Sequence, residues 1–227
     1  MVREELGETI DIHLGGSDLV FPHHENEIAQ SEALTGKELA NYWLHNGMVN
    51  VSGQKMSKSL GNFTTIRELL KSGISPMTVR FFILQAHYRK PLDFTDQALK
   101  AAKKGWEGLN RVIGIGRIYN NELGWEDNNN DNEYISKLLN KENQLEGSIK
   151  KFRDSMDDDL NTAGALAIVF ELARPLKKFS NELNNKIPIE KNSSEINSLE
   201  VRWQIIVRLL SILGFQEETS DNFTSKN

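Results

Sequence analysis

Apolar and polar residues alternate near the start of the chain, where the apolar positions are Ile10, Ile12 and Leu14. This period of two, followed by a Gly-Gly pair, predicts a strand that ends in a tight turn. From about residue 23 to residue 35 the apolar residues recur with helical spacing, and Gly36 is suited to end that helix. Two further strands and a turn are predicted to follow, at 42–45, 48–51 and 52–54. Strand, turn, helix and strand in this order are typical of an α/β region.

Beyond Leu60 the pattern becomes helical. Helices are predicted over 66–71, 77–86, 95–119, 134–157, 162–183 and 196–213. Ser75 is a typical N-cap residue with Pro76 at the first helical position, and Asn161 or Thr162 would cap a later helix. The 196–213 segment has the broad apolar face of a helix in a bundle core. The sequence therefore predicts an α/β region followed by an all-α bundle.

Polar stretches suggest where this chain divides. The segments 120–133 and 184–194 are rich in Asn, which is typical of linkers, and the residues after Phe215 hold too few apolar side chains to pack. We therefore expect four parts, at 1–62, 63–119, 134–215 and a disordered tail at 216–227.

Composition narrows the class of protein. The 227 residues are 38% hydrophobic and 26% charged, as in an ordinary globular protein, and no apolar run approaches the roughly 20 residues that cross a bilayer. The charged N-terminus has no apolar signal-peptide region, so a cytoplasmic location is expected. The chain contains no cysteine, which excludes disulfides and thiolate metal ligands within it.

The charge is distributed unevenly. The formal net charge is −5, but residues 1–120 carry 14 Lys and Arg against 13 Asp and Glu, whereas the remainder carries 13 against 19. Basic residues of the first part form small groups, among them Lys100, Lys103, Lys104, Arg111 and Arg117. A polyanion would therefore meet the first part of the chain.

A polar loop, KMSKS, runs from Lys55 to Ser59 and continues as Leu-Gly-Asn. Its two ammonium groups and two hydroxyls can wrap a triphosphate and stabilise developing negative charge. The alternative is a solvated lysine-rich turn. In this complete form the segment resembles the ATP-binding loop of class I aminoacyl-tRNA synthetases. The resemblance assigns Lys58 and Lys55 to catalysis and, with Ser57, Gly16 and Asp18, to ATP binding.

A second segment, GGSDLVFPHHENE, contains His23 and Glu27 four residues apart, so that both lie on one face of a helix and can bind one metal ion. The alternative is a surface hydrogen bond. His24 and Glu25 are expected to point elsewhere. His13 and His45, on predicted strands, are either hydrogen-bonded histidines or substrate contacts.

The Gly-Gly-Ser-Asp turn, the proline and the double histidine together resemble the cysteinyl-tRNA synthetase family. In that family the matching histidine and glutamate bind Zn2+ with two cysteines, and the zinc binds the substrate thiolate. Both cysteines and the family's His-Ile-Gly-His ATP motif are absent here. Two ligands alone would hold zinc weakly.

The resemblance extends over roughly residues 1–215, including YWLHNGMVNV and the segment MDDDLNTAGALAIVFELA, in which Asp157–Asp159 are expected to form a capping, solvated acidic face. It implies the second part of a Rossmann-type catalytic domain (1–62), a connecting region contacting the tRNA stem (63–119) and a tRNA-contacting bundle (134–215). Met1 would then be internal, and the anticodon-reading end would be missing.

The implied activity joins L-cysteine to tRNA(Cys) with ATP and Mg2+, in a cytoplasmic monomer with one zinc ion per full-length subunit. Two alternatives stay open. One is a ligase that joins cysteine to an amino sugar, and the other is a non-catalytic remnant that binds tRNA or protein.

Overall fold

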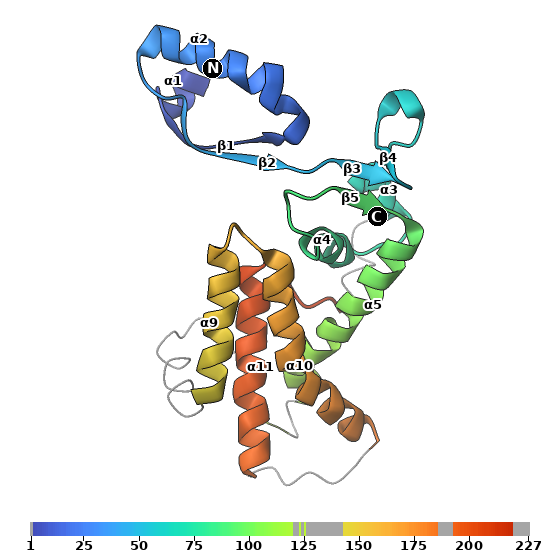
Figure 1. Ribbon diagram of the computed structural model, residues 1–227. Coiled ribbons are helices and arrows are strands. Elements are labelled where there is room, and N and C mark those ends of the chain that lie inside the picture. Colours follow the sequence, from blue (N-terminus) through green and yellow to red (C-terminus); the bar gives the residue numbers. More distant parts are fainter. Residues whose placement is uncertain (1, 120–122, 124, 126–142, 186–192, 220–227) are drawn as a thin grey trace. The chain divides into compact units, whose positions relative to one another are not determined.

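A computed structural model describes residues 2–119, 123, 125, 143–185 and 193–219 (Figure 1). The chain forms two compact units. The first comprises Met1–Thr65 and Ala86–Asp96, and the second comprises Ile66–Gln85 and Gln97–Asn227. The α/β region and the helical region predicted from sequence are confirmed as fold types.

The first unit contains a β-α-β arrangement formed, after the short helix α1 (Val2–Leu6), by β1 (Ile10–Gly16), α2 (Glu25–Thr35) and β2 (Ala40–Asn46). The two strands are parallel, with Ile10 opposite Ala40 and Gly16 opposite Asn46. Parallel neighbours need a crossover connection, and α2 supplies it. Helix α2 ends at Gly36, whose φ of 66° is left-handed, as the sequence predicted.

A second sheet in the same unit has the order β4-β3-β5, formed by β3 (Val49–Val51), β4 (Gln54–Lys55) and β5 (Leu92–Phe94). Positive φ values of 52° at Ser52 and 78° at Gly53 turn β3 into antiparallel β4. Strand β5 pairs parallel with β3, so the 63–119 region is not helical throughout. Gly47 allows this approach, because a Cβ there would lie 2.3 Å from the Lys90 carbonyl oxygen.

The second unit is helical in the part of the chain that the structure describes. Its helices are α3 (Ile66–Lys71), α4 (Pro76–Leu84), α5 (Asp96–Ile113, beginning one residue before the unit boundary), α6 (Ile115–Ile118), α9 (Asn143–Asp157), α10 (Thr162–Asn184) and α11 (Ser194–Ile212). The single helix predicted at 95–119 is interrupted at Gly114, and residues 134–142 of the next predicted helix lie outside the described residues. The predicted caps are confirmed: Ser75 accepts from the Thr78 N–H, and Asn161 accepts from the Gly164 N–H.

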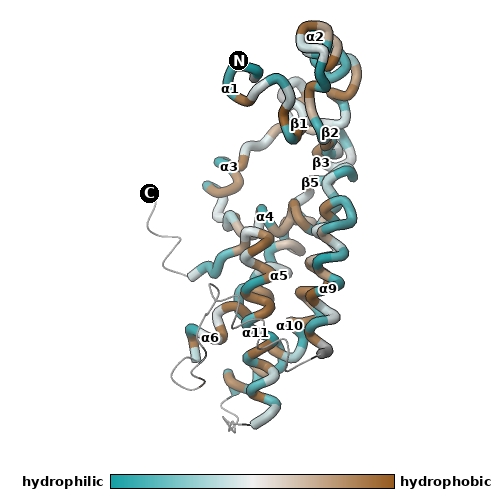
Figure 2. The backbone as a smooth tube through the Cα atoms, turned by 90° about the vertical axis from the view of Figure 1, so that its left-hand side faces the viewer, coloured by the Kyte–Doolittle hydropathy of each residue, from teal (hydrophilic) through white to brown (hydrophobic). Residues whose placement is uncertain are grey.

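The core of this unit lies among its long helices, along which Figure 2 shows many hydrophobic residues. Buried side chains include Trp106, Leu172, Leu176, Ile206 and Leu210. No described helix combines the length and hydrophobicity that crossing a membrane requires.

The segment after α11 differs from the sequence prediction of a disordered tail from residue 216. Glu218 accepts a 2.6 Å hydrogen bond from the indole N–H of buried Trp106, and its backbone N–H and carbonyl both bond to the side chain of Asn110. Glu217 pairs with Arg117 at 2.7 Å. The prediction of disorder, which was based on polar composition, is therefore wrong for 216–219, because polar groups of this segment have specific partners. Residues 220–227 lie outside the described residues.

Candidate functional site

Four histidines gather on the side of β1 and β2 that faces the connection into α2. We call His13, His23, His24, His45, Glu27 and Trp43 the histidine cluster. His13 lies opposite Trp43 in the parallel register, and their rings stack with centres 4.4 Å apart. His24 Nδ1 lies 2.8 Å from His45 Nε2, so one of these two nitrogens donates to the other. Residues from two strands and one helix start thus form one polar, aromatic site.

Gly15 makes room for the buried member of this cluster. A Cβ on Gly15 would lie 2.5 Å from His24 Cε1 and 2.7 Å from Nε2. Contacts this short do not occur with a real side chain, so His24 needs glycine at the end of β1. The sequence identified the Gly-Gly pair only as a turn, and its role in seating an imidazole became visible only in three dimensions.

His24 is 3% exposed, and its surroundings favour the neutral imidazole. Burial lowers the pKa of His24, and His13 and His45 nearby lower it further. The expectation that His24 points away from the other site residues is wrong. Its ring centre lies 4.9 Å from that of His13 and 5.6 Å from that of His23.

Glu27 lies between two histidines. Its Oε1 is 3.5 Å from His23 Nε2, and its Oε2 accepts a 2.9 Å hydrogen bond from His13 Nε2. Zinc bonds of about 2.0–2.1 Å to nitrogen and oxygen place tetrahedral ligand atoms roughly 3.3 Å apart, so the His23–Glu27 spacing fits one zinc ion. His23 is 60% exposed, which leaves space for further ligands.

His13, like His24 and His45, was not assigned to the metal site by sequence reasoning. Together with His24 and Glu27 it forms a group whose ligand atoms all lie within 4.8 Å of one another. Its hydrogen bond to Glu27 is the kind of contact that orients a metal-binding carboxylate. The available signal was the alternation in β1, which places His13 on the opposite face from Ile12 and Leu14.

The KMSKS loop begins in β4 and touches the end of β1. Lys55 Nζ lies 3.0 Å from Asp18 Oδ2, and this hydrogen bond lowers the pKa of the Asp18 carboxyl. Asp18 follows Gly16 in a short turn, Ser17–Leu19. The structure therefore brings together three residues predicted to bind ATP: Lys55, Asp18 and Gly16.

Asn62 holds the loop closed. Its Oδ1 accepts from the Ser57 backbone N–H at 2.9 Å, and its amide donates to the Lys55 carbonyl at 3.2 Å. The Ser57 and Ser59 hydroxyls are 3.1 Å apart. Lys58 begins a short helical turn, Lys58–Leu60, and its side chain lies outside the described part of the structure.

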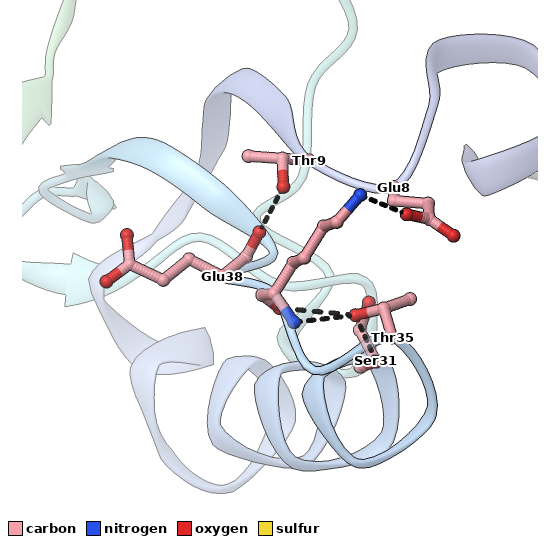
Figure 3. A network of polar contacts seen from close by, with 6 residues as sticks. Glu8, Thr9, Ser31, Thr35 and Glu38 are labelled. Atoms are coloured by element: carbon pink, nitrogen blue, oxygen red, sulfur yellow. Dashed lines mark hydrogen bonds and ion pairs between the residues drawn. The ribbon is translucent and has the colours of Figure 1, made fainter.

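The far end of the β-α-β arrangement carries a polar network (Figure 3). Lys37 pairs with Glu8 at 2.6 Å, the Thr9 hydroxyl donates to the Glu38 carbonyl, and the Thr35 hydroxyl donates to the Ser31 carbonyl. The first two contacts join the residues after α2 to the residues before β1, and the third lies within α2. A neighbouring pocket of about 380 Å³ is lined by network residues such as Glu8 and Thr35 and also by His13 and Glu27. The two elements that supply His13 and Glu27 are thereby fixed to each other.

Comparison with known protein families gives two matches. Residues 1–104 match the family described as "tRNA synthetases class I (C) catalytic domain", and residues 151–217 match the DALR domain. The chain is 58% identical over 221 residues to a cysteine--tRNA ligase of Prochlorococcus marinus (strain MIT 9303), covering 96% of this chain and 44% of that protein. It is 57% identical over 222 residues to a cysteine--tRNA ligase of Parasynechococcus marenigrum (strain WH8102), covering 97% and 45%. The chain thus spans a little under half the length of these relatives.

Solved structures share the fold at low identity. The LeuRS of Agrobacterium radiobacter K84, in a ternary complex with tRNA and LeuAMS, matches with a TM-score of 0.60 and 21% identity, covering 89% of this chain and 25% of that one. The Mycobacterium tuberculosis methionyl-tRNA synthetase bound by methionyl-adenylate matches with a TM-score of 0.55 and 18% identity, covering 90% and 41%. These likenesses concern the fold alone.

Proposed function

Because this chain belongs to the cysteine–tRNA ligase family, with the class I catalytic and DALR domains, we propose that it takes part in the ATP-dependent joining of L-cysteine to tRNA(Cys). One observation carries the proposal to particular residues. At the end of β1, Asp18 bonds to Lys55 of the KMSKS loop and Gly15 seats His24 of the histidine cluster. The KMSKS loop, assigned to ATP, and the His23–Glu27 pair, assigned to a metal ion, are therefore both next to the carboxyl end of β1. Open α/β folds bind ligands at the carboxyl ends of their strands.

In the first step, cysteine and ATP form an adenylate and pyrophosphate is released. The ammonium groups of Lys55 and Lys58 stabilise the negative charge that shifts onto the leaving pyrophosphate. The Asp18 carboxylate holds Lys55 beside Gly16 before ATP binds, and the phosphates take over this ammonium. Asn62 bonds to the backbone of Ser57 and of Lys55, which keeps the loop backbone closed. Mg2+ accompanies ATP as part of the substrate.

His23 and Glu27 would hold one zinc ion, which the family completes with two cysteines that this chain does not contain. The spacing of their donor atoms supports this assignment. When bound, zinc supplies a preference for thiolate over hydroxyl, which separates cysteine from serine more sharply than an apolar pocket can. The hydrogen bond from His13 leaves Glu27 Oε1 facing His23, so His13 acts as a positioning residue.

The acceptor decides between the two ligase alternatives. In the second step the cysteinyl group passes to the 3′ end of tRNA, and the DALR match at 151–217 supports a tRNA acceptor over an amino sugar. Incubating a protein of the relatives' full length with labelled cysteine, ATP and either tRNA or an amino sugar tests this. Transfer to the sugar alone would contradict the proposal. A protein without cysteine-dependent ATP–pyrophosphate exchange would instead support the non-catalytic remnant.

The expected setting follows from this activity. We expect a cytoplasmic monomer that meets tRNA(Cys), cysteine and ATP in solution. Analytical ultracentrifugation at micromolar concentration measures the molar mass of the protein directly. A dimer that forms with rising concentration would contradict the expected monomer.

A further inference from the structure

A basic groove lies between α5 and α10 within the second unit, with a volume of about 180 Å³. Its polar lining consists of Arg111 from α5 and Lys177, Ser180, Asn181 and Asn184 from α10. The α10 residues recur at intervals of three and four, so they share one face of that helix. The groove is separate from the histidine cluster and the KMSKS loop, which belong to the first unit.

The ammonium group of Lys177 is held inside this groove. A Cβ on Gly108 would lie 3.3 Å from Lys177 Nζ, so glycine on α5 allows the lysine to lie across that helix. The same ammonium lies 4.8 Å from the centre of the Phe170 ring. Lys177 is partly buried, and among the described residues no carboxylate forms an ion pair with it.

This arrangement is electrostatically unfavourable without an anion. Burial lowers the pKa of Lys177, and the positive charge of Arg111 lowers it further. The described lining of the groove includes no Asp or Glu. Two acids that adjoin lining residues in sequence pair with other lysines, Glu182 with Lys178 and Glu107 with Lys103. Two cations near each other with no counter-charge are typical of a site that receives an anion.

The remaining lining identifies the class of anion. Ser180, Asn181 and Asn184 provide a hydroxyl and two amides, which donate to phosphate oxygens as Arg and Lys do. From Lys177 to Asn184 the helix rises by about 10 Å, which exceeds one phosphate group and suits a strand of phosphodiesters. We propose that the basic groove binds the phosphodiester backbone of an RNA. This inference rests on the proposed function, which makes tRNA the macromolecular substrate.

The test compares two pairs of substitutions that remove the same charge. The groove variant is Arg111→Gln with Lys177→Gln. The control is Lys150→Gln with Lys178→Gln, whose lysines are exposed and already paired with Asp154 and Glu182. Fluorescence anisotropy with labelled tRNA(Cys) transcript measures binding by the 227-residue chain between about 50 and 200 mM salt.

The groove variant is expected to bind about 10-fold or more weakly, and the slope of log K against log salt is expected to become shallower by about 1–2. The control is expected to change by less than about 2-fold. A second groove variant, Arg111→Gln with Lys177→Met, keeps the lysine stem over Phe170 and guards against loss of packing. Its thermal unfolding midpoint is expected to match the wild type, and its RNA binding to match the first variant.

Equal losses in groove and control variants would overturn the proposal, as would a wild-type chain that binds no tRNA. Inorganic phosphate or ATP that displaces the labelled tRNA at micromolar concentration would replace it with a small-anion site. Cysteine-dependent pyrophosphate exchange, measured on a protein of the relatives' full length, does not need tRNA. Failure of that exchange therefore counts against the proposed function, and failure of groove-dependent RNA binding counts against this inference alone.

Discussion

Replacing His13 with alanine is expected to weaken zinc binding although His13 is not assigned as a ligand. The substitution removes the 2.9 Å hydrogen bond to Glu27 Oε2 and the ring that stacks on Trp43, and it leaves His23 unaltered. Glu27 then loses the contact that holds Oε1 at 3.5 Å from His23 Nε2. The carboxylate, 37% exposed, is free to turn toward solvent.

The magnitude follows from the number of ligands and from the role of the hydrogen bond. With two protein ligands we expect the chain to bind zinc no more tightly than about 1 μM. Losing a contact that orients a ligand costs about 10–100-fold in metal affinity, or roughly 1.4–2.8 kcal/mol. His23→Ala removes a ligand outright and is expected to abolish measurable binding. His87→Ala, which changes the one histidine outside the cluster, is expected to have no effect.

Competition with a colorimetric chelator measures these three variants and His24→Ala at one pH. An affinity unchanged by His13→Ala would refute the positioning role. A different result would refute the ligand assignment itself: if His13→Ala and His24→Ala abolish binding while His23→Ala does not, the metal is held by the group of His13, His24 and Glu27, of which only His24 is buried. Stoichiometric zinc that survives dialysis against a mild chelator would contradict the weak affinity.

Three further predictions concern the loop, the chain alone and the C-terminal segment. In a protein of the relatives' full length, Lys58→Ala is expected to lower kcat for adenylate formation by about 100-fold or more, with a much smaller change in the KM for ATP. Lys55→Ala is expected to act in the same way but more weakly. Pyrophosphate-exchange kinetics measure both variants, and an unchanged kcat for Lys58→Ala would exclude the catalytic assignment. The 227-residue chain alone is expected to show no cysteine-dependent exchange above the Lys58→Ala level. Glu218→Ala is expected to destabilise the second unit by about 1–3 kcal/mol in urea unfolding, because it leaves the buried Trp106 N–H without an acceptor. Glu217→Ala breaks the surface ion pair with Arg117 and is expected to cost about 0–1 kcal/mol. Equal shifts for the two glutamates would contradict that reasoning.

Signals carried by neighbouring residues could be predicted from the sequence. Ser75 with Pro76 and the Asn161 cap each depend on a hydrogen bond spanning three residues, and the structure contains both. The positions of His23 and Glu27 on one helical face likewise follow from a spacing of four. Local geometry sets these features, so one stretch of sequence is enough to predict them.

Features that depend on distant pairs were missed. Strand β5 has three residues, too few for a period of two to be recognised, and it forms only because β3 offers a parallel edge some 40 residues earlier. Glu218 reaches Trp106 across 112 residues of sequence. His13 joins the site only because β1 and α2 lie against each other. No local pattern records such contacts, because the whole fold creates them.

The location of the candidate site nevertheless follows from topology once the β-α-β arrangement is known. Parallel β1 and β2 are in register to their ends, at Gly16 and Asn46, so the residues just beyond β1 must emerge at one edge. Asp18 and the two histidines before α2 occupy that short connection, and the crossover requires α2 to begin there. Gly15 at the end of β1 then leaves room for the buried imidazole of His24. The hairpin that carries Lys55 joins the same edge through the hydrogen bond from Lys55 to Asp18. The chemistry of this edge therefore depends on the backbone path as much as on the residues that resemble the family.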